Sequence, residues 1–215
     1  MGYFRELPNL RYPSFLPEKT SSLDYVEVKN IFRRVKLRDD LQNSFTVFDK
    51  YEIPEGARPD IVAEELYGNA EFDWIVLTVA GILNVRNQWP LNNRDLYNYC
   101  LDKYGESLNS NRFFETTEVK DSNDRLILPK GKVVDFNFTI PKPGEPTATI
   151  NPVVGITNYE YETRLNDEKR NIFILREGYL QQFLSDIREI MTYDESSEFI
   201  DERTAQTENS NITLS

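Results

Sequence analysis

The sequence predicts an α+β fold, and three stretches of the chain indicate it. Residues 51–83 combine the end of a strand, a turn and two short helices. Between 112 and 140, apolar side chains alternate with polar ones, which is the period of a half-buried antiparallel strand. Residues 180–191 repeat apolar side chains every three or four positions, as an amphipathic helix does.

The stretch 51–83 carries a chemical signal at each of its junctions. The Pro-Glu-Gly turn at 54–56 suits a chain reversal, because glycine adopts positive φ without strain. Pro59 stands where the first helix begins, a position that needs no backbone N–H. Gly68 is a C′ residue that ends this helix.

The second helix of this stretch is predicted to start near Glu71. It is apolar nearly all round, so we expect it to be buried on every side. Its apolar residues are Phe72, Trp74, Ile75, Val76, Leu77, Val79 and Leu83.

Residues 1–22 are rich in both prolines and aromatic side chains. A disordered tail would be poor in aromatic residues, and the spacing of the prolines argues against a helix or a central strand. We therefore expect an extended arm that lies across another surface, such as that of a partner chain. The candidate partner-binding residues of the arm are Tyr3, Phe4, Leu7, Leu10, Tyr12, Phe15 and Leu16.

The segment 23–41 predicts a short extended or helical element that includes a basic cluster. A strand that leads into the 54–56 turn follows, marked by Phe45, Val47, Tyr51 and Ile53.

A further helix is predicted at 93–104, after a turn-rich stretch. Asn92 or Asn93 would cap its N-terminus, and Gly105 would end it. One face of this helix carries Leu96, Tyr97, Cys100, Leu101 and Tyr104.

The alternating region 112–140 predicts short antiparallel strands with one face in water. Turn residues at 122–124 and 130–131 would connect them.

The proline-rich segment 141–152 predicts a loop or a subdomain boundary. Residues 153–164 and 170–175 flank Asn166-Asp167, which predicts a hairpin.

The clearest helix covers 180–191, where one face carries Leu180, Phe183, Leu184, Ile187, Ile190 and Met191. The residues after it have a composition typical of disorder in isolation, so we expect an assembly to hold them. Four segments result: an arm and short element at 1–41, a central module at 42–90, a helix, strands and a closing helix at 91–191, and an acidic polar tail at 192–215.

The composition excludes several kinds of function. A formal net charge of −11 argues against binding to nucleic acid or to an anionic membrane. The chain has no histidine, which removes every Ser-His and Cys-His catalytic arrangement. Its single cysteine, Cys100, excludes internal disulfides and zinc sites with several thiolates, and its aromatic neighbours favour a packed thiol over a nucleophile.

The first residues lack the apolar core of a secretory signal, and the longest apolar run, 74–83, is too short to span a bilayer. We expect a soluble chain that folds in a reducing cytoplasm.

The sequence also lacks phosphate-binding glycine patterns, metal-ligand spacings and nucleophile elbows. Some acidic residues could be assigned as a general acid and base. Chance pairs are expected among 36 carboxylates, however, and such residues are explained as part of a solvent-exposed face. We expect a protein that is not an enzyme and that needs no cofactor or metal. The acidic residues considered are Glu64, Glu65, Asp73, Asp95, Glu160 and Glu162.

The ordered parts of 51–83 resemble a LysM-type βααβ module. They are similar in particular to the LysM-like segment of the small baseplate wedge protein of T-even-type contractile-tailed bacteriophages. Residues 30–33 are similar to the N-terminal stretch of that family, and 171–175 and 183–191 to its closing strand and helix, whereas 112–152 matches no part of it. The resemblance in the centre rests on Gly56, Arg58-Pro59-Asp60, Leu66-Tyr67-Gly68-Asn69 and Phe72-Asp73-Trp74.

This resemblance implies a structural protein of the virion, assembled in the host cytoplasm into the tail baseplate. Such proteins stand in several copies around the tail axis, bind other wedge subunits and help to join adjacent wedges into a ring. Sheath-initiating or hub proteins are further expected partners, while nucleic acid and membranes are not. The candidate contact residues lie in two loops: Glu55, Gly56, Ala57, Arg58, Leu83, Asn84, Val85, Arg86 and Asn87.

Glycan binding is the alternative function, because in LysM modules the sugar lies between loops at these two positions. Arg58, Arg86 and the missing secretory signal weaken this alternative, and Tyr67 and Trp74 are expected to be core residues. A carboxylate-dependent hydrolase is a third and weaker hypothesis.

Overall fold

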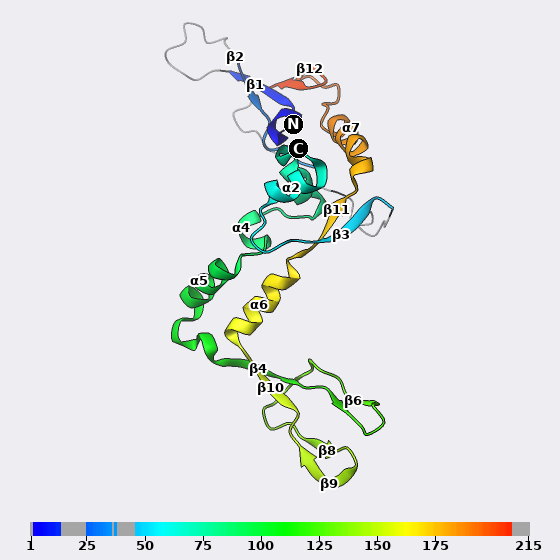
Figure 1. Cartoon of the computed structure of the whole chain (residues 1–215). Coiled ribbons are helices and arrows are strands. Elements are labelled where there is room, and N and C mark those ends of the chain that lie inside the picture. The colour runs from blue at the N-terminus through cyan, green and yellow to red at the C-terminus, as the bar shows by residue number, and fades with distance from the viewer. Residues whose placement is uncertain (1, 14–24, 36, 38–45, 208–215) are drawn as a thin grey trace. The chain divides into compact units, whose positions relative to one another are not determined.

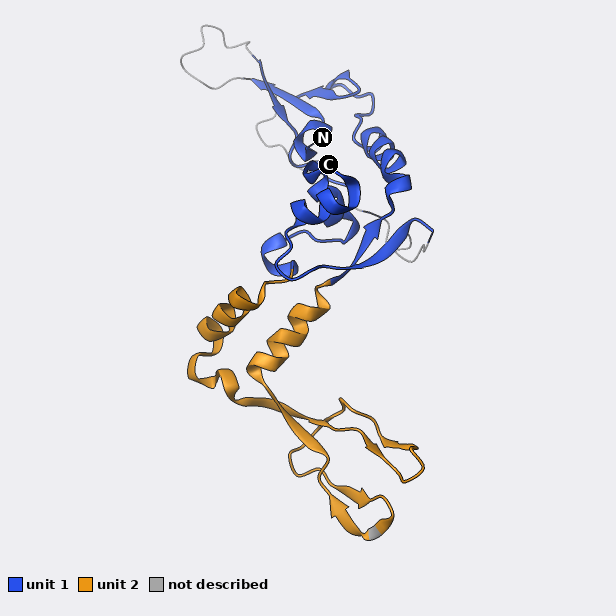
Figure 2. Cartoon of the chain, in the orientation of Figure 1, with its two compact units in different colours: residues 1–89, 171–215 blue, residues 90–170 orange. Residues whose placement is uncertain are grey.

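The computed structural model describes residues 2–13, 25–35, 37 and 46–207 and has an α+β fold (Figure 1). The chain forms two compact units (Figure 2). Unit 1 comprises 1–89 and 171–215, and unit 2 comprises 90–170. Residues 171–191, which were expected in one segment with 91–170, thus lie in unit 1. No helix in the described part of the chain combines the length and apolarity that a membrane span requires.

A four-stranded sheet in unit 1 joins the two ends of the chain. Its order is β12 (Phe199–Asp201), β13 (Thr204–Gln206), β1 (Asn9–Pro13) and β2 (Tyr25–Lys29). Strand β1 runs parallel to β13 and antiparallel to β2.

The expectation that the N-terminal arm forms neither a helix nor a central strand is wrong. Helix α1 covers Tyr3–Glu6, and β1 lies between two other strands. The prolines permit both elements because Pro8 precedes β1 and Pro13 is its last residue, so neither interrupts the ladder.

The described part of the polar tail after α7 is paired within the chain, through β13 and its neighbour β1, while support of the tail by an assembly stays a prediction. The Asn9 amide donates to the Arg203 carbonyl at 2.7 Å, and the Thr207 amide donates to the Arg11 carbonyl at 2.9 Å. Composition predicted disorder for this segment because composition does not record pairing with a distant strand. Residues 208–215 lie outside the described part of the chain.

The central stretch follows the predicted order of strand, turn and two helices. Strand β3 is Phe48–Glu52, and helix α2 is Pro59–Tyr67, with Pro59 in its first turn. Gly68 ends α2 in the left-handed conformation at φ 66°, and its amide donates to the Glu64 carbonyl at 2.9 Å. The predicted start and stop of this helix are confirmed.

The second helix is shorter than predicted. It begins as η2 (Ala70–Phe72), continues as α3 (Asp73–Val79) and stops before Gly81, whose φ is 70°. Leu83 lies beyond the helix with 78% of its surface exposed, so its predicted burial is wrong. The buried residues of α3 are Trp74, Ile75, Val76 and Val79.

The strand that pairs with β3 follows unit 2 in the sequence. Strand β11 (Asn171–Leu175) runs antiparallel to β3, with Tyr51 opposite Ile172. After β11, η4 (Glu177–Tyr179) leads into α7 (Leu180–Ile190), which confirms the predicted closing helix.

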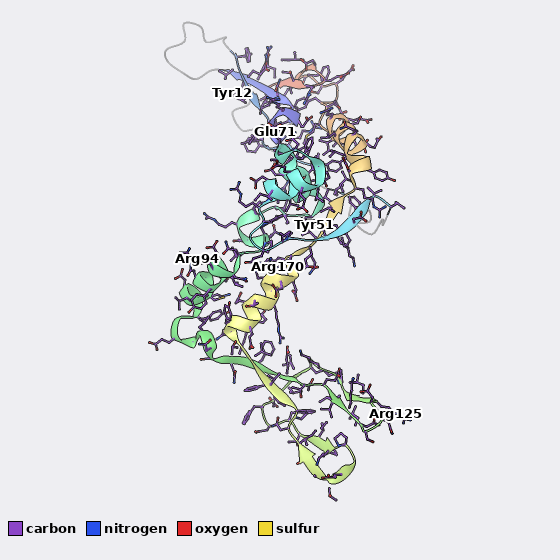
Figure 3. All side chains as sticks on the ribbon, viewed as in Figure 1. Tyr12, Tyr51, Glu71, Arg94, Arg125 and Arg170 are labelled. Atoms are coloured by element: carbon purple, nitrogen blue, oxygen red, sulfur yellow. The ribbon has the colours of Figure 1, made fainter. Side chains whose placement is uncertain are left out.

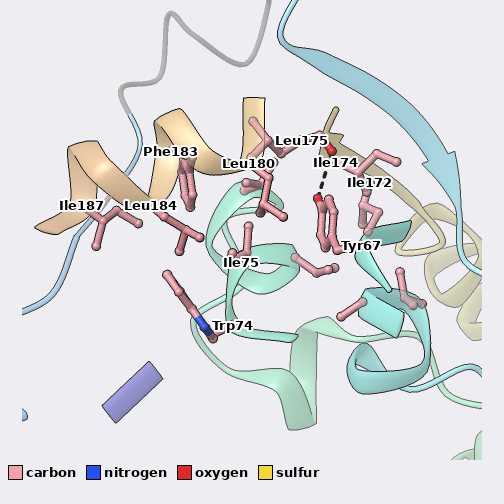
Figure 4. Packing of buried hydrophobic residues seen from close by; sticks show 14 of the residues in the cluster. Tyr67, Trp74, Ile75, Ile172, Ile174, Leu175, Leu180, Phe183, Leu184 and Ile187 are labelled. Atoms are coloured by element: carbon pink, nitrogen blue, oxygen red, sulfur yellow. Dashed lines mark hydrogen bonds between the residues drawn. The ribbon is translucent and has the colours of Figure 1, made fainter. Parts of the chain in front are cut away.

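These elements enclose one apolar core (Figure 4). Side chains of α7 pack against α3, and the rings of Trp74 and Phe183 lie 6.4 Å apart. The Tyr67 hydroxyl donates to the Leu175 carbonyl at 3.0 Å. Tyr67 and Trp74 are therefore core residues, as predicted.

Unit 2 begins with α5 (Asn93–Tyr104), capped by the Asn92 side chain and ended at Gly105, as predicted. It continues through η3 (Gly105–Asn109) to β4 (Asn111–Thr116). Strands β10 (Val153–Thr157) and β7 (Val133–Val134) flank β4 in an antiparallel sheet.

Two hairpins extend from this sheet. Strands β5 (Val119–Lys120) and β6 (Leu126–Leu128) form the first, with Asp124 at φ 60° in its turn, and the predicted turn at 122–124 is confirmed. Strands β8 (Ile140–Lys142) and β9 (Glu145–Ile150) form the second. The expected break at 141–152 is thus wrong, because Gly144 at φ 82° turns the chain between paired strands.

The predicted hairpin around Asn166 is also wrong. Helix α6 (Asn158–Glu168) occupies this region, and β10 and β11 pair with other strands. A capping box starts the helix, since Thr157 accepts from the Glu160 amide while the Glu160 carboxylate accepts from the Thr157 amide. This Thr-x-x-Glu spacing was visible in the sequence.

Candidate partner-binding surface

The first candidate loop, 55–58, is a tight turn between β3 and α2. The Ala57 amide donates to the Pro54 carbonyl at 3.1 Å, and Gly56 takes a φ of 72°. Ala57 packs partly against the core, while its three neighbours are exposed. The backbone is therefore held in one shape and presents a mostly polar edge.

Arg58 extends from this loop, but its charge is paired locally. Its Nε donates to Asp60 Oδ1 at 3.0 Å, and its terminal nitrogen also contacts the Asp60 carboxylate. This hydrogen bond raises the pKa of Arg58 and lowers the pKa of Asp60. A partner would meet a neutral pair and not an isolated cation.

The second candidate loop, 83–87, follows α3 and enters the short helix α4 (Val85–Gln88). Gln88 closes the loop, since its Oε1 accepts from the Leu83 amide at 2.9 Å and from the Asn84 amide at 2.8 Å. Leu83 and Val85 remain exposed apolar side chains. The loop thus offers two aliphatic side chains on a fixed backbone.

Trp89 brings the two loops together. Its indole Nε1 donates to the Ala57 carbonyl at 2.9 Å, and the ring is buried against the core. Sequence reasoning placed Trp89 in a turn-rich stretch and missed this role. A buried indole N–H needs an acceptor, which was the available signal.

The residues predicted to form a partner-binding arm divide into buried and exposed sets. Leu7 and Leu10 are buried within unit 1, and the Tyr3 ring lies 5.6 Å from the Trp74 ring. Phe4 is exposed and Tyr12 is half-buried. Phe15 and Leu16 lie outside the described residues. The arm's contact with a partner stays a prediction, and among its described residues Phe4 is the most accessible.

An ion pair that the sequence did not suggest fastens the arm to α7. The buried Glu6 carboxylate accepts from Arg188 Nε at 2.8 Å and from a second Arg188 nitrogen at 3.1 Å. This bidentate bond keeps the pKa of Glu6 below its ordinary value. Arg203 adds a bond to the Glu6 carbonyl at 3.0 Å.

The 30–33 segment leaves a second apolar edge on unit 1. The Arg33 guanidinium lies 5.0 Å from the centre of the Tyr193 ring and donates to the Ile190 carbonyl at 3.2 Å. Ile31 and Phe32, just before it, are exposed. Arg33, which belongs to the predicted basic cluster, therefore makes its contacts within the chain.

Several of the carboxylates considered for acid–base chemistry bind other groups of the chain and have structural roles. Glu160 caps α6, and Asp95 accepts from the Asn92 side chain at 2.9 Å. Glu162 accepts from Lys103 at 2.8 Å and from the Tyr104 hydroxyl at 2.6 Å. Among the described residues there is no cluster of ligands suited to a metal ion. The Cys100 thiol is buried, and burial raises its pKa.

A protein-family model described as base plate wedge protein 53 matches residues 14–118. The matched range contains both candidate loops and ends after β4. No curated protein matches the chain. The chain is thus similar to base plate wedge protein 53 over nearly half of its length, and this similarity supports a phage baseplate wedge protein with a structural role in the tail.

Proposed function

We propose that this chain is a structural subunit of a contractile-tailed phage baseplate, where it binds other wedge proteins and helps to join adjacent wedges into a ring. The match of the wedge-protein family to 14–118 is the observation that carries the proposal. The protein would stand in several copies around the tail axis, next to other wedge subunits and sheath-initiating or hub proteins. It would assemble in the host cytoplasm.

The loop surface formed by 55–58 and 83–87 is the proposed site of contact with a neighbouring wedge protein. Bonds from Gln88 and Trp89 hold both loops in place. A preorganised loop loses little conformational entropy on binding, so the exposed side chains contribute more of their contact energy to affinity. The two exposed aliphatic side chains would fill apolar recesses of the partner, and the Arg58–Asp60 pair would lie at the rim.

A LysM-like arrangement supports the finer family assignment to T-even-type phages. Strand β3, helices α2 and α3, and strand β11 follow the order of a βααβ module in which unit 2 is inserted before the second strand. The two helices and the strand pair share one core. Glycan binding through this module receives no support from the family match.

The proposed role involves no catalysis. The contacts of Glu160 and Glu162 are those of a helix cap and an ion pair, which are structural tasks. The stability of assembled wedges would be the measurable outcome of the protein's presence.

Mass spectrometry of purified tail particles tests the proposal, and the chain's absence from them would refute it. A second test combines Leu83→Ser with Arg86→Ala, which should reduce incorporation into tails while the isolated chain stays folded. Ile61→Ser on α2 is the matched control, because Ile61 is also an exposed apolar residue of unit 1. Equal incorporation of the loop variant and the control would remove the loops from the proposed contact.

A further inference from the structure

Segment 117–151 of unit 2, here named the hairpin segment, contains β5 to β9. None of its described side chains is buried, whereas unit 1 and the rest of unit 2 both contain buried residues. An isolated two-stranded hairpin is at best marginally stable in water. Strand β7 pairs with β4, but β5–β6 and β8–β9 are sheets of only two strands, which contacts with a further surface would stabilise.

The hairpin segment also exposes large apolar side chains that a solvated hairpin does not need. Exposed apolar surface gathered in one segment is typical of a protein interface. These residues are Leu126 (56% exposed), Ile127 (50%), Val133 (70%) and Phe136 (62%).

The charges of the hairpin segment balance one another. It contains five basic and five acidic side chains, so the chain's net charge of −11 comes from the remaining residues. Lys120 pairs with Glu118 and with Asp124 at 3.2 Å in each case, and Lys142 pairs with Glu145 at 3.0 Å. Arg125 lies in the turn between β5 and β6 (Figure 3).

The balance of charge in the hairpin segment affects which kind of partner can bind it. Lys120 and Lys142 are paired within their own hairpins and the formal charges of the segment sum to zero, so the segment has little field with which to attract a charged partner. Two copies of this acidic chain repel one another through their remaining residues, and this segment is the region through which they can approach without net repulsion.

We propose that the hairpin segment is a self-association surface, on which the hairpin segment of a second copy of this chain packs. A second copy offers an apolar surface that has no net charge and that also carries strand edges. Packing of the two segments would remove the four exposed side chains from water and order both hairpins. The inference uses the purified chain's own surface and does not depend on the baseplate role.

Sedimentation velocity of the full chain from micromolar to millimolar concentration tests the proposal. The expected result is a monomer that associates with rising concentration and does so more strongly in high salt, because salt screens the repulsion between the acidic units and leaves the apolar contact intact. The triple variant Leu126→Ser, Ile127→Ser and Phe136→Ser should weaken association about tenfold or more. The matched control is Ile61→Ser, Leu83→Ser and Ile190→Ser, which removes exposed apolar residues of unit 1 and should leave association unchanged.

Cysteine cross-linking locates the contact without disturbing the apolar surface as a whole. A bis-maleimide should cross-link the Ile127→Cys chain into dimers and should leave the Leu83→Cys chain monomeric, since Cys100 is buried in both. A chain that stays monomeric at every concentration would overturn the proposal. Cross-linking through 83 and not through 127 would overturn it as well, as would protection of 117–151 from hydrogen exchange only in the presence of a different protein.

Discussion

The two units of this chain are stabilised in different ways. Unit 1 has one apolar core of 19 buried residues drawn from both ends and the middle of its sequence. The corresponding cluster of unit 2 has three buried residues, Leu96, Cys100 and Leu108. Since burial of apolar surface is the dominant favourable term in folding, unit 1 should be the more stable of the two.

Unit 2 relies instead on polar links between its elements. Glu162 of α6 binds Lys103 and Tyr104 of α5, and Arg164 donates to the buried Glu115 of β4 at 2.7 Å. Asn166 of α6 both donates to and accepts from the backbone of Leu91. Such links specify geometry well but add less free energy than a large core.

The units also differ in charge. Unit 2 holds 11 of the 25 basic side chains and 13 of the 36 acidic ones, so most of the negative charge belongs to unit 1. A stable acidic unit and a nearly neutral insertion with a small core therefore share one chain. Unit 1 then supplies most of the free energy of folding, and unit 2 carries the proposed self-association surface.

Ile75→Ala should produce the largest effect, because it opens a cavity in the core of unit 1, where Ile75 is fully buried. We expect a loss of about 2–5 kcal/mol in the free energy of unfolding. Chemical denaturation followed by circular dichroism measures it. The exposed residue Ile61 supplies the control, since Ile61→Ala should cost less than about 0.5 kcal/mol. Equal losses would show that the described core does not govern the stability of unit 1.

Glu162→Gln should destabilise unit 2 selectively, by about 1–2 kcal/mol, since Lys103 is partly exposed and water screens the pair. Hydrogen exchange resolved by segment should show faster exchange in α5 and α6 and no change in α3. Glu168→Gln, at the exposed end of α6, is the control. A uniform change across both units would contradict their energetic independence.

The same carboxylate predicts an acid dependence. Burial alone would raise the pKa of Glu162, but hydrogen bonds from Lys103 and Tyr104 outweigh it and lower the pKa. The stabilisation is therefore present above the pKa of the unfolded chain and is lost as pH falls through the lower folded value. Acid titration of α5 and α6 exchange rates should show this loss in the native protein and not in Glu162→Gln.

Tyr67→Phe should cost unit 1 about 1 kcal/mol, because the Leu175 carbonyl loses a buried hydrogen bond. Burial raises the pKa of Tyr67 to about 12, above the value of about 10 in an unfolded chain. Its contribution should thus be complete below the unfolded value and should be lost as pH rises toward the folded one. Tyr51→Phe is the control, because burial and a hydrogen bond to Glu65 raise the pKa of Tyr51 to about 12 as well. It distinguishes the alkaline loss of stability due to Tyr67 from that due to Tyr51. An alkaline profile unchanged in Tyr67→Phe would refute this assignment.

Gln88→Ala should have the smallest effect, about 0.5–1 kcal/mol, since it removes two bonds to exposed backbone amides. The expected signature is local: faster hydrogen exchange at 83–84 with the rest of unit 1 unchanged. Arg86→Ala on the same short helix should leave these amides as they were. Slow exchange in the Gln88 variant would mean that other contacts hold the loop.

Local sequence signals predicted the ends of α2 and α5. Pro59 and Gly68 bound α2, and Asn92 and Gly105 bound α5, because each residue acts on backbone within one turn of itself. The amphipathic period of α7 was equally clear. For the candidate surface, the two loops were placed from the chain order, but the bonds from Gln88 and Trp89 that hold them were not foreseen.

The pairing of distant segments was beyond these signals. The segment of β1 was predicted as part of an arm on another surface because its partner β13 lies near the other end of the chain. Likewise, β3 pairs with β11 across the whole of unit 2. Proline spacing and polar composition describe only a segment's own preferences. These preferences do not reveal which distant strand will form hydrogen bonds with the segment.

The sequence alone therefore determined the α+β class, the boundaries of α2, α5 and α7, and the acidic, histidine-free composition of this protein. Tertiary structure decided that strands near both ends of the chain share one sheet, that unit 2 is inserted between paired strands, and that the described side chains of the hairpin segment are left unburied. The physical reason is range. Capping and turn preferences act over a few residues, whereas core packing and strand register depend on contacts between residues far apart in the chain.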